Sequence, residues 1–227
     1  MTDPDDALRA AVVPFGDEIG SLLEKVFGEP VAIGVEWLHG RFRVRPTSPL
    51  RLTIDGDGLA TMLPEFRCTW DSARTYLAVE KSTIKLTALV DRAPIFRFEY
   101  ERDAHSKPAA HIQVHGHRGA LSHLLSRARH ETPHSMEALH LPVGGSRFRP
   151  CLEDVLQFLI EDFGFDAKPG RRTAVAEGRE RWRRYQLRAA VRDAPSDAAD
   201  TLRLLGYTIT DPPNGAPPDS ITKLQAW

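Results

Sequence analysis

Residues Ile95–His117 read IFRFEYERDAHSKPAAHIQVHGH, and this stretch carries the most unusual chemistry of the chain. Apolar and polar residues alternate on both sides of a polar turn, which is typical of two strands joined as a hairpin. The first strand places Arg97, Glu99 and Glu101 at every other position. The polar row of the second strand is His111, Gln113, His115 and His117. Each row lies on one face of its strand, so the hairpin is expected to have an apolar face that packs under helices and a polar face.

The register between these two strands decides whether the polar rows form a site. If the rows share one face, imidazoles and carboxylates lie side by side. A shift of one residue would place the rows on opposite faces. Eight of the nine histidines of the chain fall between His105 and His140, which makes this region the first place to look for function.

Composition sets the broad class of the protein. With 227 residues, 41% of them hydrophobic and 27% charged, the chain suits one globular domain of moderate size or one domain with a helical appendage. The net charge of -1 means that attraction to nucleic acid must come from a local patch. No apolar run approaches the ~20 residues of a membrane span. The acidic start does not resemble a secretion signal, and Cys68 and Cys151 lie far apart, so we expect a cytoplasmic protein with reduced thiols and no membrane partner.

The first half of the chain predicts one helix followed by strands. Residues 5–27 have a helical period that Pro14 is expected to break or kink. Residues 31–45 form a long extended run, with a bend or bulge at Gly34 or Gly40. The further strand candidates are 50–55, 65–70, 73–81, 82–90 and 95–101. Short connections between them favour antiparallel pairing, so we expect an α+β fold with a curved, mainly antiparallel sheet of five to seven strands and helices on one face.

The second half predicts a helical C-terminal part. A short amphipathic helix is expected near 121–128 and a short strand near 138–145. An apolar stripe over 152–163 ends at Gly164, a favourable residue at a helix C-terminus. A basic helix follows over 171–193, and then a short last helix. The predicted organisation is therefore an α+β core over 1–165, a helical extension over 166–210, and a Pro-rich linker and tail over 211–227.

Several chemistries would use the polar face of the hairpin. Imidazoles can act as base and acid near neutral pH in metal-free RNA cleavage, a neighbouring carboxylate can orient them, and an arginine can stabilise a phosphorane. The candidate catalytic residues are His111, His115, Glu99 and Arg97, with His117 in reserve. Metal binding is a second alternative, although alternate strand residues lie ~6.5–7 Å apart and rarely converge on one ion. Recognition of an anionic partner is a third, and a merely solvated sheet face is the fourth. Cys151, near a helix start, is a further candidate nucleophile, although a buried cysteine is the common case.

Two basic segments are candidates for nucleic-acid contact. The helix from Arg171 to Arg192 holds eight arginines, with Trp182 and Tyr185 interleaved. The aromatic rings either stack on bases or pack inward together with Val175, while the arginines pair with the acidic face of the preceding helix. The candidate nucleic-acid contacts are Arg41, Arg43, Arg45, Arg183 and Arg184. If the strand of Arg41–Arg45 lies next to the histidine hairpin, the two form a basic groove.

The run from Thr75 to Gly116 resembles the core of TumE-type toxins and related uncharacterised proteins of bacterial mobile elements. The resemblance rests on Phe96, Arg97, Tyr100, His111 and His115. It implies a toxin–antitoxin or antiviral defence setting, with RNA as a target and a cognate antitoxin or other protein as a partner. The function expected from the sequence is therefore a metal-independent ribonuclease without a cofactor, and the alternative is a non-enzymatic binding or adaptor protein of such a system.

Overall fold

The chain is described here by a computed structural model, over residues 4–71, 74–90, 93–104, 107–116, 131–136, 141–143 and 145–225. The strands are β1 (Ile33–Leu38), β2 (Arg41–Pro46), β3 (Leu50–Ile54), β4 (Asp57–Trp70), β5 (Leu77–Ala88), β6 (Pro94–Glu101), β7 (Ala110–Val114) and β8 (Leu141–Pro142). The helices are α1 (Pro4–Phe27), α3 (Gly145–Phe148), α4 (Leu152–Phe163), α5 (Arg171–Asp193), α6 (Pro195–Leu204) and α7 (Ile221–Leu224). The helix expected near 121–128 and part of the strand expected near 138–145 lie outside the described residues.

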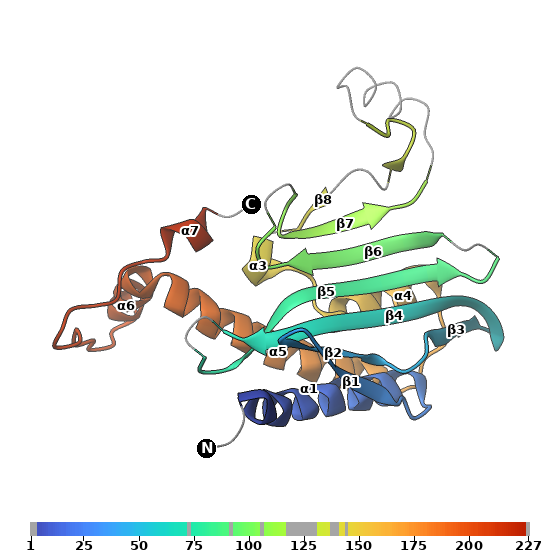
Figure 1. Ribbon diagram of the computed structural model, residues 1–227, viewed down its shortest axis with the longest axis horizontal. Helices are drawn as coiled ribbons and strands as arrows, with labels where there is room; N and C mark the ends of the chain where they lie inside the picture. The colour runs from blue at the N-terminus through green and yellow to red at the C-terminus, as the bar shows by residue number, and fades with distance from the viewer. Residues whose placement is uncertain are drawn as a thin grey trace.

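The strands form one antiparallel sheet in the order β1-β2-β4-β5-β6-β7-β8, with β3 paired to the start of β4. Seven strands have five residues or more, and β8 adds two residues at the edge. Helices α1, α4 and α5 lie behind the sheet in Figure 1, and the front of the sheet faces the viewer. The predicted α+β fold is therefore confirmed.

Alternation along the strands separates the covered face of the sheet from its open face. On β4, Ala60, Met62 and Cys68 are buried, whereas the intervening Glu65 and Arg67 point to the other side. The covered face packs against apolar stripes of the helices, and the core includes Leu23 of α1, Leu156 of α4 and Val175 of α5. The sheet thus places its charged residues together on the face that none of the described helices covers.

Helix α4 is held in place by its two ends. The backbone N–H of Cys151 donates to the Asp154 carboxylate at 3.1 Å. Gly164 ends the helix with φ of 73°, a left-handed conformation that glycine adopts without steric cost. Just beyond it, the Asp166 carboxylate accepts from the Thr53 hydroxyl at 2.7 Å and from backbone N–H groups of the β3–β4 turn. These contacts fix α4 against the sheet under β6, where Phe96 and Phe98 meet Phe158.

Two local predictions were wrong, and of the break or kink predicted at Pro14, the break does not occur. Helix α1 continues through Pro14, because buried residues on both sides, such as Val12, anchor it to the sheet. The run 31–45 is a hairpin and not one bent strand, since His39 and Gly40 both take positive φ, as a tight two-residue turn requires. The expected break at Lys81–Ser82 lies within the continuous strand β5.

The C-terminal part runs away from the body of the protein. Figure 1 shows α6 and α7 at the end of α5, to one side of the sheet. None of the described side chains of α6 is buried. Ser196 and Asp219 are joined by a side-chain hydrogen bond, and the Ser220 N–H donates to the Asp193 carbonyl at 2.7 Å, so the Pro-rich segment returns to the end of α5. Within the described residues, no helix is both long enough and apolar enough to cross a membrane.

Candidate functional site: the open face of the sheet

The register of β6 and β7 places the two polar rows on one face. Glu99 lies directly opposite His111, and Arg97 lies directly opposite Gln113. Directly opposed residues of antiparallel strands project to the same side. Of the two arrangements that the sequence left open, the structure has the one in which imidazole and carboxylate meet.

His111 is held by oxygen atoms on both sides of its ring. Its Nδ1 lies 3.0 Å from the carbonyl oxygen of Pro108, and its Nε2 lies 3.1 Å from Oε2 of Glu99. Both ring nitrogens are therefore engaged by oxygen atoms of the hairpin. The residue is only 1% exposed. The ring is therefore held within the hairpin and does not present a nitrogen to solvent.

Glu99 is held in its ionised form. The hydrogen bond from His111 is the largest effect, and the nearby charges of Arg97 and Lys107 act in the same direction against partial burial. Together they lower the pKa of Glu99 to about 2. Arg97 Nη1 lies 3.8 Å and Lys107 Nζ lies 3.7 Å from the carboxylate oxygens. The structure thus brings together three of the four predicted catalytic residues, Arg97, Glu99 and His111.

The fourth predicted catalytic residue, His115, lies apart from this group. It follows the end of β7, and its backbone N–H donates to the Ile95 carbonyl at 2.9 Å. His111 and His115 are four residues apart on an extended chain, which corresponds to ~13 Å. That separation is too large for the two imidazoles to act on the same phosphate. His117 lies outside the described residues.

The arginine side chains of the predicted basic strand project from the same face of the sheet as the polar rows, but the strand is not adjacent to the histidine hairpin. Strand β2 is separated from β6 by β4 and β5, so the expected groove between neighbouring strands does not form. Arg41 is ion-paired with Glu80, and Arg43 with Glu36. Arg45 has no ion pair within the described part of the chain.

Cations from three neighbouring strands line up across this face. Arg43 of β2 is opposite Arg67 of β4, and Arg67 is opposite Lys81 of β5. We call these three residues the cation row. A second like-charged pair, Lys85 of β5 opposite Arg97 of β6, lies further along the same strands. Arg67, Lys81 and Lys85 were not among the residues predicted for this site, although their alternation with buried residues in β4 and β5 would have placed them on the open face.

The basic helix α5 divides its aromatic residues between inside and outside. Val175 is buried, and Trp182 packs inward, with the guanidinium carbon of Arg149 4.6 Å from its ring centroid. Tyr185 is 52% exposed. The predicted pairing with the preceding helix occurs at one arginine, since Arg179 bonds Asp154 of α4 at 2.6 Å.

The two predicted nucleic-acid contacts of α5 both lie on its outer surface. Arg183 and Arg184 are exposed, and Arg184 is paired with Glu180 at 2.7 Å within the helix. Neither residue belongs to the open face of the sheet, because α5 lies on the opposite, covered side.

The remaining chemical candidates find little support in the geometry. Burial, together with the nearby carboxylates of Glu153 and Asp154, raises the pKa of the Cys151 thiol, so a reactive thiolate is disfavoured at this position. The thiol donates to Asp154 at 3.2 Å. In the described ranges, no group of three or more histidine, cysteine or acidic side chains is arranged to hold a metal ion.

A scan against models of known protein families, a search of curated proteins and a search of solved structures each found no match. Function must therefore be argued from the open face of the sheet and from the residues next to it.

Proposed function

We propose that the protein is a non-enzymatic binding protein that binds RNA through the open face of its sheet. The observation that carries this proposal is the cation row, Arg43, Arg67 and Lys81 in direct register. Like charges directly opposite each other on a sheet are unfavourable, by roughly 0.2–1 kcal/mol per pair. Glu36, Glu65 and Glu101 each lie near one cation of the row and offset part of that repulsion, and a bound polyanion would offset the rest.

The charge balance of the open face supports the same proposal. Eight cationic residues of the strands belong to it: Arg41, Arg43, Arg45, Arg51, Arg67, Lys81, Lys85 and Arg97. Five carboxylates accompany them: Glu36, Glu65, Glu80, Glu99 and Glu101. The difference is three positive charges on a protein with a net charge of -1. Cations spread over adjacent strands match the repeated phosphates of a nucleic acid better than one small anion.

The kind of readout also follows from what the face contains. The aromatic residues of β6, Phe96, Phe98 and Tyr100, lie on the covered side. Among the paired strand residues that the structure describes, the open face carries no phenylalanine, tyrosine or tryptophan ring. Contact there would therefore be with phosphates, which gives affinity with little dependence on sequence.

RNA cleavage stays a prediction that the geometry favours less than binding. A general base needs a free nitrogen within hydrogen-bond reach of the proton that it removes. His111 is buried and directs both nitrogens to Pro108 and Glu99. The setting implied by the resemblance to TumE-type toxins, with a cognate antitoxin as partner, is compatible with either activity and also stays a prediction.

Fluorescence anisotropy with a labelled RNA of about 20 nucleotides, titrated at several salt concentrations, tests the proposal. Arg45→Ser/Lys85→Ser removes two open-face cations that have no ion pair within the described residues. For a single strand, this should reduce the slope of log K against log salt by about 1.4, at ~0.7 per phosphate contact.

Lys25→Ser/Arg172→Ser is the matched control, because these two exposed cations lie on α1 and α5 in the helical layer. The control should leave the slope unchanged. Equal slopes for both double variants, or no RNA binding by the wild-type protein, would overturn the proposal. Gel analysis of the RNA after the titration shows whether it has been cleaved, which would favour the ribonuclease prediction.

A further inference from the structure

A stripe of tyrosine and arginine side chains lies where α5 passes the end of the sheet. Tyr185, Arg188 and Arg192 have the spacing i, i+3, i+7, so they follow one face of α5. The guanidinium carbon of Arg188 is 5.9 Å from the ring centroid of Tyr185. That of Arg192 is 4.2 Å from the ring centroid of Tyr76, which precedes β5. We call these four residues the tyrosine–arginine stripe.

Both tyrosine rings of the stripe are accessible to a ligand. Tyr185 is 52% exposed and Tyr76 is 38% exposed. They differ in this from the other aromatic–arginine cluster nearby, where Arg149 is 8% exposed between the rings of Tyr100 and Trp182. The inner cluster holds α5 against the sheet, whereas the tyrosine rings of the stripe keep solvent-exposed surface on which a ligand could pack.

Tyr76 is also held in position before any ligand arrives. Its backbone N–H donates to Oδ1 of Asp71 at 3.1 Å, and its carbonyl accepts from the Asp71 N–H at 3.0 Å. The Thr75 N–H donates to the same Asp71 oxygen at 2.6 Å. These bonds fix the backbone at Tyr76, and the contact with Arg192 limits its ring, so less conformational entropy is lost when a ligand stacks on it.

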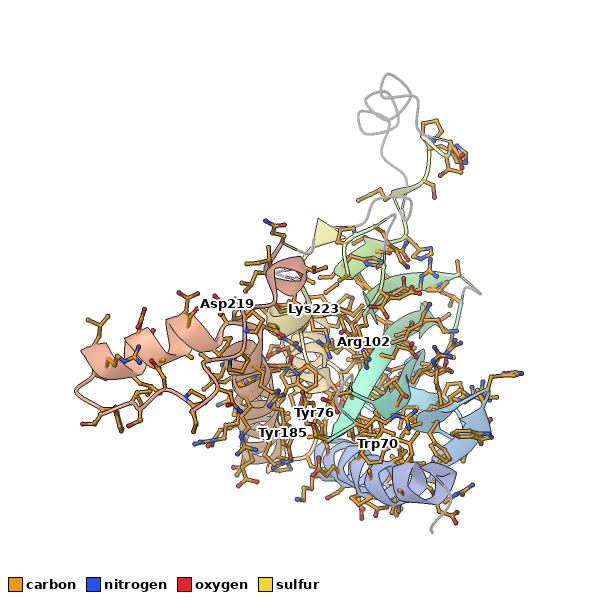
Figure 2. All side chains as sticks on the ribbon, turned by 60° about the vertical axis from the view of Figure 1, so that its left-hand side comes forward. Trp70, Tyr76, Arg102, Tyr185, Asp219 and Lys223 are labelled. Atoms are coloured by element: carbon orange, nitrogen blue, oxygen red, sulfur yellow. The ribbon has the colours of Figure 1, made fainter. Side chains whose placement is uncertain are left out.

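An unsatisfied donor lies on the same side of the molecule. Figure 2 shows Arg102, Tyr76 and Tyr185 together around the end of the sheet. Arg102 follows β6, and its backbone N–H donates to the Glu80 carbonyl at 2.8 Å. Its Nη2 is buried and has no hydrogen-bond partner in the described part of the chain.

Backbone pairing at the end of β5 and β6 connects the region of the stripe with the strand that carries Lys81 of the cation row. Lys81 of the row is opposite Glu101, the residue before Arg102. Glu80, next to Lys81, accepts the backbone bond of Arg102. The backbones of Lys81 and Arg102 thus adjoin at the end of the sheet, while the side chains of Glu101 and Arg102, as neighbours along the chain, project to opposite sides.

We propose that the tyrosine–arginine stripe stacks on unpaired bases and makes the protein selective for single-stranded over double-stranded RNA. This inference rests on the proposed function. Tyrosine faces stack on bases of any sequence, and the neighbouring arginines bind the adjoining phosphates. In a duplex the bases are stacked on one another and their faces are not available. Tyr185 and Arg192 are separated by two helical turns, ~10.5 Å, which leaves room for more than one nucleotide along the stripe.

The test compares a labelled single-stranded RNA with a duplex of the same sequence, using wild-type protein and three variants. Tyr76→Ser/Tyr185→Ser should weaken single-strand binding at least about 30-fold, from two lost stacking contacts, and change duplex binding less than about twofold. Tyr76→Phe/Tyr185→Phe keeps both rings and should retain single-strand affinity. Tyr207→Ser is the matched control, because Tyr207 is 63% exposed beyond α6 and outside the stripe. Circular dichroism of each variant checks the fold.

The outcomes separate the stripe from the proposal on which it rests. Equal affinity of the wild-type protein for the two RNAs would overturn the stripe while leaving RNA binding by the sheet intact. Unchanged single-strand affinity in a folded Tyr76→Ser/Tyr185→Ser variant would do the same. If neither RNA binds to the wild-type protein, the proposed function itself fails, and the stripe fails with it.

Discussion

Replacement of Glu99 by glutamine tests the hydrogen-bonded pair of Glu99 and His111 at the centre of the histidine hairpin. The pKa of Glu99 is lowered from 4.5 to about 2, mainly by the hydrogen bond from His111. Each tenfold change in proton affinity is worth about 1.4 kcal/mol, so the ionised environment contributes at most about 3 kcal/mol. Because glutamine still offers a neutral acceptor to His111, we expect Glu99→Gln to lower the free energy of unfolding by about 1–3 kcal/mol at pH 7.

The lowered pKa of Glu99 also predicts how the stability difference between wild type and Glu99→Gln changes with pH. A carboxyl whose pKa is lowered by folding stabilises the protein above its unfolded pKa, and that stability is lost as pH falls through the folded value. The difference between wild type and Glu99→Gln should therefore be constant above pH 4.5 and shrink as pH falls toward about 2. Urea unfolding followed by circular dichroism at several pH values measures it.

A second carboxylate on the same face of the sheet provides the control for Glu99. Glu65 lies 3.9 Å from Arg67, and its side chain is 25% exposed. Glu65→Gln should change stability by less than about 0.5 kcal/mol. A Glu99→Gln protein as stable as wild type at pH 7, or a difference that stays constant down to pH 2, would refute the reasoning.

Two further predictions concern the packing behind the sheet. Leu156→Ala should lower the free energy of unfolding, measured with urea, by about 2–5 kcal/mol, because Leu156 is 0% exposed in the core. A decrease of less than about 1 kcal/mol would contradict the packing described. Arg149→Ala should lower the free energy of unfolding by about 2–4 kcal/mol, because it empties the space between Tyr100 and Trp182. Arg149→Met should recover most of that loss, because it keeps the volume and removes a buried charge. Equal unfolding midpoints for the two variants would show that the space between the rings does not matter.

The fold class could be predicted because the alternation in the strands and the stripe of α4 are local signals. Phe96 and Phe98 alternate with Arg97 and Glu99, and the structure turns the first pair toward α4. The continuity of β5 was missed because Lys81–Ser82 resembles a turn, although its neighbours on β4 and β6 supply the hydrogen bonds of a ladder. Such support comes from residues distant in sequence, which a local pattern does not contain.

The candidate site was predictable only in part for the same reason. The rows of Glu99 and His111 could be recognised, but their register depends on how β6 and β7 pair. The position of Arg43 relative to the hairpin depends on the order of strands in the sheet, with β4 and β5 inserted between. The burial of His111 could not be anticipated either, because it depends on the tertiary packing around the hairpin.

Ultraviolet cross-linking of the wild-type protein to a single-stranded RNA, followed by mass spectrometry of the attached peptides, tests RNA binding by the open face most directly. We expect cross-links in peptides of β4, β5 and β6, which carry Arg67, Lys81 and Arg97, and at Tyr76 or Tyr185 beside them. Cross-links confined to α1 and α4, which cover the opposite face of the sheet, would contradict it.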